Sequence, residues 1–180
     1  MGKPDQSEGR RNELYARLQK LQADLAGVHA QLARLGPGEV LPGLFVLVDV
    51  GDQVAALPSS LVLEVVRLVK TTPLPEAPDH VLGTFVYRGE PALAIDLKRY
   101  LSLTTEEPDL DAHMVVLATA RPMAIVVDRV RALVEAPQVA EAPKDAKNWL
   151  SSPLVAALCH AEGSLVAVLR IEPLLEGVPS

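Results

Sequence analysis

Short apolar runs separated by turn residues constrain this chain more than any other feature of its sequence. Such runs, rich in Val, Leu and Ala and bounded by Gly, Pro or Asp, are typical of β-strands. Nearly every connection between them is too short for a crossover helix, so mainly antiparallel sheets are expected. The ten runs are residues 44–50, 53–57, 61–69, 82–88, 91–97, 114–119, 123–130, 132–136, 154–161 and 164–171.

Many short strands at close spacing favour a barrel or a sandwich, because closing a sheet removes its exposed edges. The ten runs fit two small barrels that share a core, so the expected fold class is mainly β. Short helical turns are expected at residues 58–60, 96–101 and 172–175. Surface loops are expected where the chain is rich in proline or in polar and acidic residues, at 71–81, 104–112 and 135–149.

A different pattern precedes the strands. Apolar residues recur there at alternating steps of four and three, which is the a/d stripe of a heptad repeat. They are Leu14, Leu18, Leu21, Leu25, Val28, Leu32 and Leu35. The stripe predicts a long amphipathic helix over residues 10–36, of which residues 10–35 span about 39 Å. The helix ends at the Gly-Pro-Gly sequence of residues 36–38.

The amphipathic helix has two interpretations. Such a helix usually packs on its own globular domain, but a stripe confined to a and d positions favours a coiled coil. A homodimer through residues 10–35 is the expected assembly, although Leu-rich a and d positions specify the oligomeric state poorly.

Composition excludes several classes of protein. The chain has 180 residues, 49% of them hydrophobic, and can bury a substantial core. Its net charge of −6 argues against a nucleic-acid partner. One cysteine forms no internal disulfide, residues 1–14 lack the apolar stretch of a signal peptide, and no run is long enough to cross a membrane. A soluble cytoplasmic protein is expected.

Catalytic and metal-binding patterns are weak. The four histidines are widely separated, without metal-ligand spacing to Cys, Asp or Glu. Cys159 and His160 are neighbours on a predicted strand and would point to opposite faces. The acidic pair Glu106-Glu107 lies in a hydrophilic loop, where nothing would raise a carboxyl pKa. No enzyme, cofactor or metal site is predicted, and an enzyme is the least supported interpretation.

Binding to another protein is the remaining class of function, and the Arg88-Gly89 turn is the main candidate for the binding site. A glycine lets the chain reverse immediately after the apolar run that ends at Arg88. A guanidinium at the edge of an apolar surface is a common interface anchor, whereas an ordinary exposed hairpin-tip arginine is the alternative. Glu64 interrupts the run 61–69. If both strands belong to one barrel, Glu64 and Arg88 are expected to pair, which would orient Arg88.

The sequence of residues 81–97, VLGTFVYRGEPALAIDL, resembles the CheW family of chemotaxis coupling proteins. The family's run has Gly, two or three residues, Asn-Leu-Arg-Gly, a proline-containing apolar strand and Asp-Leu. The residues that match it are Gly83, Arg88, Gly89, Asp96 and Leu97. The resemblance extends over residues 44–176 and includes Val62 and Glu64 of a Val-x-Glu strand, the segment MAIVVDRVRALVEAP and the closing LVAVLRIEPLL. Val86 stands where the family has Asn, and Arg170 stands where it has an acid.

This resemblance implies two intertwined five-stranded SH3-like β-barrels over residues 44–176. It implies a non-enzymatic adaptor that couples the cytoplasmic tip of a chemoreceptor to the regulatory domain of a histidine kinase, in the cytoplasm at receptor arrays. If the family's receptor-facing positions are carried over to this sequence, Arg88, Glu64 and Val62 face the receptor. The alternative is a coiled-coil dimeric scaffold or competitor that binds kinase or receptor without coupling them. Outside this domain the chain would divide into a tail (1–9), the helix (10–36), a linker (37–43) and a second tail (177–180).

The heptad stripe yields a testable expectation about assembly. Size-exclusion chromatography with light scattering should give the mass of a dimer for the full chain and of a monomer once residues 1–40 are removed, because the predicted coiled coil is then absent. Equal oligomeric states with and without the segment would refute dimerisation through it.

Overall fold

The computed structural model describes residues 34–144 and 148–176, together with six residues of the N-terminal segment. The chain divides into two units, Met1–Arg34 and Leu35–Ser180. The six described N-terminal residues are helical and exposed: Glu13, Ala16, Arg17, Gln19, Lys20 and Ala23. The heptad residues Leu14, Leu18, Leu21, Leu25, Val28 and Leu32 lie outside the described residues. The helix and its coiled coil over residues 10–33 therefore stay predictions, as do the tails at 1–9 and 177–180. The predicted end at residue 36 is wrong, because Arg34, Leu35 and Gly36 are not helical.

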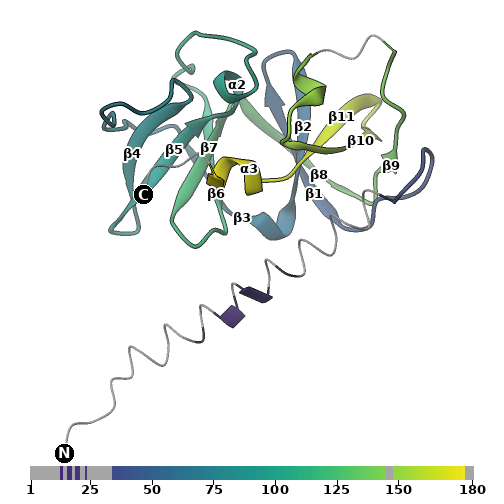
Figure 1. Cartoon of the computed structure of the whole chain (residues 1–180), viewed down its shortest axis with the longest axis horizontal. Helices are drawn as coiled ribbons and strands as arrows, with labels where there is room; N and C mark the ends of the chain where they lie inside the picture. The colour runs from purple at the N-terminus through teal and green to yellow at the C-terminus, as the bar shows by residue number, and fades with distance from the viewer. Residues whose placement is uncertain are drawn as a thin grey trace, which may run out of the picture. The chain divides into compact units, whose positions relative to one another are not determined.

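The body is built from two β-sheets that lie side by side (Figure 1). The strands of the first sheet are β1 (Leu44–Val50), β2 (Gln53–Pro58), β8 (Arg129–Glu135), β9 (Gln138–Val139), β10 (Val155–Ala161) and β11 (Ser164–Leu169). Those of the second are β3 (Val62–Arg67), β4 (Val81–Tyr87), β5 (Glu90–Asp96), β6 (His113–Leu117) and β7 (Met123–Val127). Three short helical segments lie between strands of the described body, η1 (Ser59–Leu61), α2 (Leu97–Tyr100) and η2 (Asn148–Ser151), and α3 (Glu172–Glu176) follows β11.

The mainly β fold class is confirmed, and each of the ten predicted strands has a counterpart. The helical turns expected near residues 58–60, 96–101 and 172–175 are present as η1, α2 and α3. No helix among the described residues is long and apolar enough to cross a membrane.

The expectation of two closed five-stranded barrels needs correction. Within the described residues, the first sheet has six strands in the order β8-β1-β2-β11-β10-β9, and the second has five in the order β3-β6-β7-β5-β4, both of them open. The sixth strand is β9, which lies in a segment predicted as a loop. It has two residues, too few for an alternating pattern, and it forms by pairing with β10. Most pairs are antiparallel, but β2 with β11 and β5 with β7 are parallel.

The two edge strands of the second sheet, β3 and β4, approach each other although they do not form a ladder. The chain after β3 forms an isolated antiparallel bridge to β4, in which Thr72 and Thr84 exchange backbone hydrogen bonds of 2.7 and 2.8 Å. The interior that this sheet encloses is lined partly by small side chains, namely Ala92, Ala94, Ala112 and Ala124. Such small residues leave room for a tight curl of the sheet.

Asp128 ties the two sheets together at the point where the chain passes from β7 to β8. Its carboxylate accepts hydrogen bonds of 2.6 Å from the Gly51 backbone N–H, in the β1–β2 turn, and from Lys98 Nζ on α2. Its own N–H donates to the Asp49 carbonyl oxygen at 3.0 Å. The predicted single strand 123–130 is therefore interrupted at Asp128, which serves as the tie between the sheets.

Asp96 and Leu97 also have structural roles. The Asp96 carboxylate caps α2 by accepting hydrogen bonds from the backbone N–H groups of Lys98 and Arg99. Both Asp96 and Leu97 are fully buried. Burial raises the pKa of Asp96, while the two backbone N–H bonds and the nearby Arg99 oppose that rise. This cap fixes the chain at the end of β5.

The linker before β1 is part of the body's structure. The Gly38 N–H donates to the Val139 carbonyl oxygen, and the Leu41 N–H donates to the Pro137 carbonyl oxygen, both at 2.8 Å. Leu41 is fully buried. A truncation that tests the N-terminal segment without damaging this linker should therefore remove residues 1–34 rather than 1–40.

Gly83 permits the close approach of the two edge strands. Its φ of 125° lies in a region that side-chain-bearing residues rarely adopt, and a Cβ at this position would overlap the backbone of Thr72 and Pro73. Only glycine fits where the chain after β3 crosses β4.

Gly83→Ala should therefore lower the free energy of unfolding by about 2–4 kcal/mol in a urea titration, through backbone strain and overlap. The matched control is Gly163→Ala in the β10–β11 turn, where φ is 75° and nothing lies within 4 Å of the added Cβ. This control should lose only about 1–2 kcal/mol, the left-handed backbone penalty. Equal losses in the two variants would contradict the role of close approach at Gly83.

Candidate partner-binding site

The β4–β5 hairpin holds Arg88 in an uncommon backbone conformation. Tyr87 and Glu90 are the last paired residues, so Arg88 and Gly89 form a two-residue loop. Their φ angles are 51° and 87°, and two positive values are what a type I′ hairpin turn requires. A left-handed backbone costs a residue such as arginine about 1–2 kcal/mol. Arg88 is therefore not the residue that the turn itself favours, since Asn-Gly is the preferred sequence.

Glu64, Tyr87 and Arg88 form one contact group, here called the Glu64 cluster. The Tyr87 hydroxyl donates to Glu64 Oε2 at 2.9 Å, and Arg88 Nη2 donates to the same oxygen at 3.1 Å. The Arg88 guanidinium carbon lies 5.2 Å from the centre of the Tyr87 ring, within cation–π range. The pairing of Glu64 with Arg88 expected from the sequence is confirmed as a contact.

The contacts within the Glu64 cluster favour a charged Glu64 and a neutral Tyr87. The hydrogen bond from Tyr87 is the main cause that lowers the pKa of Glu64, followed by the hydrogen bond from Arg88. Desolvation raises the pKa of Tyr87, and its hydrogen bond to Glu64 raises it further. Glu64 is thus a carboxylate and Tyr87 a neutral donor at neutral pH. The Arg88 side chain is 74% exposed, so its remaining N–H donors are available to a partner.

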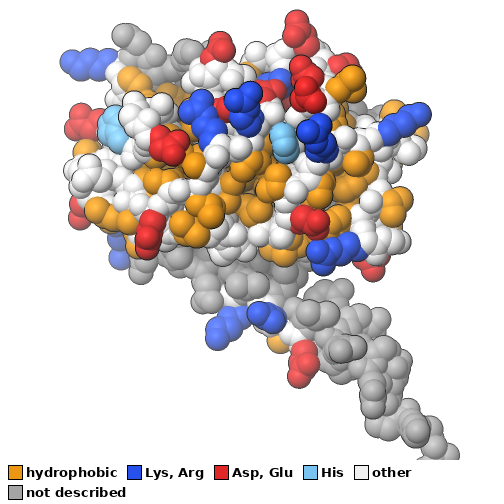
Figure 2. Space-filling view, turned by 180° about the vertical axis from the view of Figure 1, so that it is seen from behind, with side chains coloured by type: hydrophobic (Ala, Val, Ile, Leu, Met, Phe, Trp, Pro, Cys, Tyr) orange, Lys and Arg blue, Asp and Glu red, His pale blue; other side chains and the backbone are white. Residues whose placement is uncertain are grey.

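The strand that carries Glu64 also exposes apolar side chains. The register between β3 and β6 shifts between Val62 and Glu64, and such a bulge re-aims side chains. Leu63 within the bulge is 59% exposed, and Val65 beyond Glu64 is 38% exposed. Val62, the third predicted receptor-facing residue, is half-buried at the start of β3. Figure 2 shows apolar side chains gathered in a band across one face of the body, with charged side chains around it.

Tyr87 is the residue that the sequence analysis missed. The sequence analysis includes it in the apolar run that ends at Arg88 and assigns its hydroxyl no role. The available signal was alternation along the strand, which places residue 87 on the same face as the buried Phe85 and opposite to the 77% exposed Val86. A tyrosine facing inward at the end of a strand needs a hydrogen-bond partner for its hydroxyl, and Glu64 was the acid already expected nearby.

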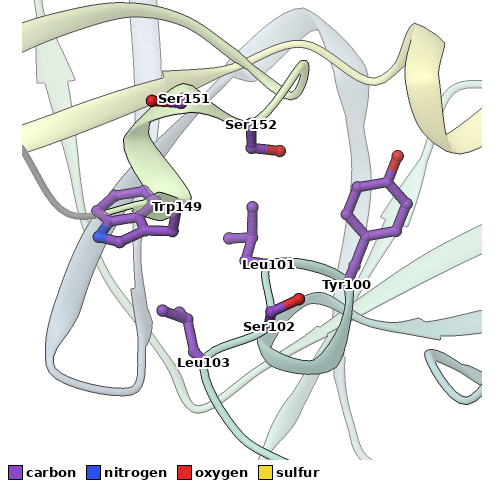
Figure 3. A pocket seen from close by; sticks show the side chains of 7 residues that line it. All are labelled: Tyr100, Leu101, Ser102, Leu103, Trp149, Ser151 and Ser152. Atoms are coloured by element: carbon purple, nitrogen blue, oxygen red, sulfur yellow. The ribbon is translucent and has the colours of Figure 1, made fainter.

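A separate cavity of about 510 Å³ lies between the end of α2 and η2 (Figure 3). It is lined by Tyr100, Leu101, Ser102, Leu103, Trp149, Ser151 and Ser152. This lining contains three serines but neither a histidine nor an acid that could activate one of them as a nucleophile. The Trp149 nitrogen is turned away from the centre of the cavity (Figure 3).

The other groups considered for chemistry are dispersed. Over the described ranges, no group of three or more His, Cys, Asp or Glu residues could hold a metal ion. Cys159 is fully buried, and burial raises its thiol pKa to about 11, so it remains protonated at neutral pH. His80 packs edge-on against Tyr100, with ring centres 4.9 Å apart, and burial lowers its pKa.

Comparison with known proteins gives consistent results. The sequence profile of the CheW-like domain matches residues 44–178. The chain is 27% identical over 128 residues to the chemotaxis protein CheW of Helicobacter pylori, covering 71% of this chain and 78% of that protein. It is 45% identical over 53 residues to protein FrzA of Myxococcus xanthus, covering 29% of this chain and 33% of FrzA. In structure it is similar to the scaffolding protein TtCheW of Thermoanaerobacter tengcongensis, with a TM-score of 0.61 and 19% identity over 72% of this chain and 85% of that one.

The strained turn predicts how stability responds to change at Arg88. Arg88→Asn should leave the free energy of unfolding in urea unchanged or raise it by up to about 1 kcal/mol, because Asn tolerates the left-handed backbone better and an exposed ion pair contributes little.

The matched control is Arg67→Asn, which removes another exposed arginine that pairs with an acid, Asp111, at 3.5 Å. Arg67 lies in the regular strand β3, where Asn is unfavourable, so this control should be slightly destabilised. A loss in Arg88→Asn larger than in the control would contradict the inference that arginine is unfavourable in this turn.

Proposed function

This chain belongs to the CheW-like domain family, and on that premise we propose that it is a non-enzymatic chemosensory adaptor that couples chemoreceptor cytoplasmic tips to the regulatory domain of a histidine kinase. The observation that carries the proposal is the exposed Arg88 guanidinium, held by Glu64 and Tyr87 at a turn whose left-handed backbone is unfavourable for arginine. Strain maintained at an exposed polar residue is a feature of functional sites.

The receptor-binding surface proposed here combines charge and apolar area. Arg88 has N–H donors beyond the one that Glu64 accepts, and these would bind carboxylate or carbonyl oxygens of a receptor helix. Leu63 and Val65, exposed on the strand of Glu64, would contact the apolar face of the same helix, with Val62 at the start of that strand. This is the usual mode in which an amphipathic helix is recognised. Such an adaptor would work in the cytoplasm and be recruited to receptor arrays.

A second candidate function is supported by the N-terminal segment. The heptad stripe lies before residue 44, outside the part of the chain that matches the family. A dimeric scaffold or competitor would use a coiled coil over residues 10–35 to form a homodimer or recruit another protein, and would bind kinase or receptor without coupling them. Val86, 77% exposed where the family has Asn, also favours a changed partner preference.

Arg88→Glu tests the receptor-facing role. Titration with a receptor-tip fragment should show binding weakened by at least about tenfold. The reason is that an arginine buried at the interface in the complex is replaced by an acid, which the oxygen atoms of the receptor helix repel. Circular dichroism and the urea midpoint should stay close to those of the unchanged protein, and binding to the kinase regulatory domain should be retained.

Arg67→Glu is the matched control, since it reverses an arginine of similar exposure, 79% against 74% for Arg88, at the end of β3 away from Val62. It should bind the receptor fragment as the unchanged chain does. Equal binding by Arg88→Glu and Arg67→Glu would contradict the role of Arg88, and loss of kinase binding in Arg88→Glu would contradict separate surfaces for the two partners.

A further inference from the structure

We propose that Tyr87 is a positioning residue for Arg88: its hydroxyl holds the Glu64 carboxylate that orients the Arg88 guanidinium, and its ring supports that guanidinium from the side. This inference rests on the proposed function, because the orientation of Arg88 matters only if Arg88 contacts a partner. It concerns a residue for which the family run, Asn-Leu-Arg-Gly, has leucine.

The geometry gives Glu64 two donors at one oxygen. Tyr87 Oη lies 2.9 Å from Glu64 Oε2 and Arg88 Nη2 lies 3.1 Å from it. Two donors to one oxygen fix the position of a carboxylate more closely than a single contact does. The guanidinium is then held twice, by the carboxylate and by the aromatic ring 5.2 Å away.

Tyr87 is the member of the Glu64 cluster that is anchored in the protein. It packs against the core cluster that contains Phe85 and Met114, and it is the last residue of β4 paired with β5. In contrast, the side chains of Glu64 and Arg88 are 40% and 74% exposed. Two long exposed side chains lose conformational entropy when they pair, and such pairs are weak on their own. Contact with the anchored Tyr87 ring reduces the conformational entropy that the Arg88 side chain still has to lose when a partner binds.

The sequence around Arg88 fits this role. The chain has Val at position 86 and Tyr at position 87. Along β4 these positions face opposite sides, since Val86 is 77% exposed and Tyr87 packs on the core. The hydroxyl of Tyr87 is therefore on the side where Glu64 lies. Leucine at position 87 would offer neither a hydrogen bond to Glu64 nor a π-face to Arg88.

Tyr87→Phe separates the hydroxyl from the ring, and Tyr87→Leu removes both. In titrations with a receptor-tip fragment, Tyr87→Phe should weaken binding about threefold to tenfold, and Tyr87→Leu should weaken it further. On the free protein, carboxyl NMR should give a higher pKa for Glu64 in Tyr87→Phe than in the unchanged chain, because the bond that lowers this pKa is lost. Tyr100→Phe, which removes a hydroxyl bonded to the Pro173 carbonyl oxygen, should change neither quantity.

Three results would overturn the proposal: unchanged receptor binding in Tyr87→Phe, an unchanged Glu64 pKa in that variant, or Tyr87→Leu binding as well as the unchanged chain. A double-mutant cycle with Glu64→Gln provides the second test, since effects that simply add would show that Tyr87 does not act through Glu64. If the unchanged chain binds no receptor fragment, the proposed function fails. The Glu64 titration and the mobility of the Arg88 side chain by nitrogen relaxation then decide the positioning role alone, and equal mobility in Tyr87→Phe overturns it.

Discussion

The close approach of strands β3 and β4, the two edges of the second sheet, is the constraint on which the candidate site depends. The contacts that hold these edges together include the Thr72–Thr84 backbone bridge and the hydrogen bonds that Tyr87 and Arg88 donate to Glu64. The small side chains inside the sheet and the missing Cβ of Gly83 leave space for the curl. Without this curl, Glu64 and Arg88 would lie at opposite edges of a flat sheet, with three strands between β3 and β4, and no cluster would form.

The residues shared with the family run separate into two kinds once their surroundings are known. Gly83 and Asp96 are explained by the fold, the first by a backbone crossing and the second by a helix cap. Asp128 likewise joins the two sheets through hydrogen bonds to Gly51 and Lys98. Arg88 has no comparable structural explanation, because it is exposed and occupies a backbone region better suited to Gly or Asn. That contrast is the physical reason for proposing a partner-binding role for Arg88.

The sequence predicts those parts of the fold and of the candidate site that depend on a local pattern of residues. Alternating apolar runs and turn residues predicted the ten strands, and an acid interrupting an apolar strand predicted the Glu64–Arg88 contact. Other features depend on tertiary structure and leave little trace in a short window. The strand β9 is two residues long and forms only by pairing with β10. In the sequence Asp128 is one more residue of a predicted strand, because its hydrogen-bond donors, Gly51 and Lys98, are distant along the chain. The sequence analysis misses Tyr87 because it counts the side chain as apolar, whereas its hydroxyl donates a hydrogen bond to Glu64.

The most direct test of the adaptor account is the rate of histidine kinase autophosphorylation, measured with a receptor-tip fragment, with and without this protein. The account predicts stimulation that requires both the receptor fragment and this protein, and that is lost in Arg88→Glu. Binding of the protein to receptor or kinase with no change in the autophosphorylation rate would contradict coupling, and would instead support a scaffold or competitor that acts through its N-terminal segment.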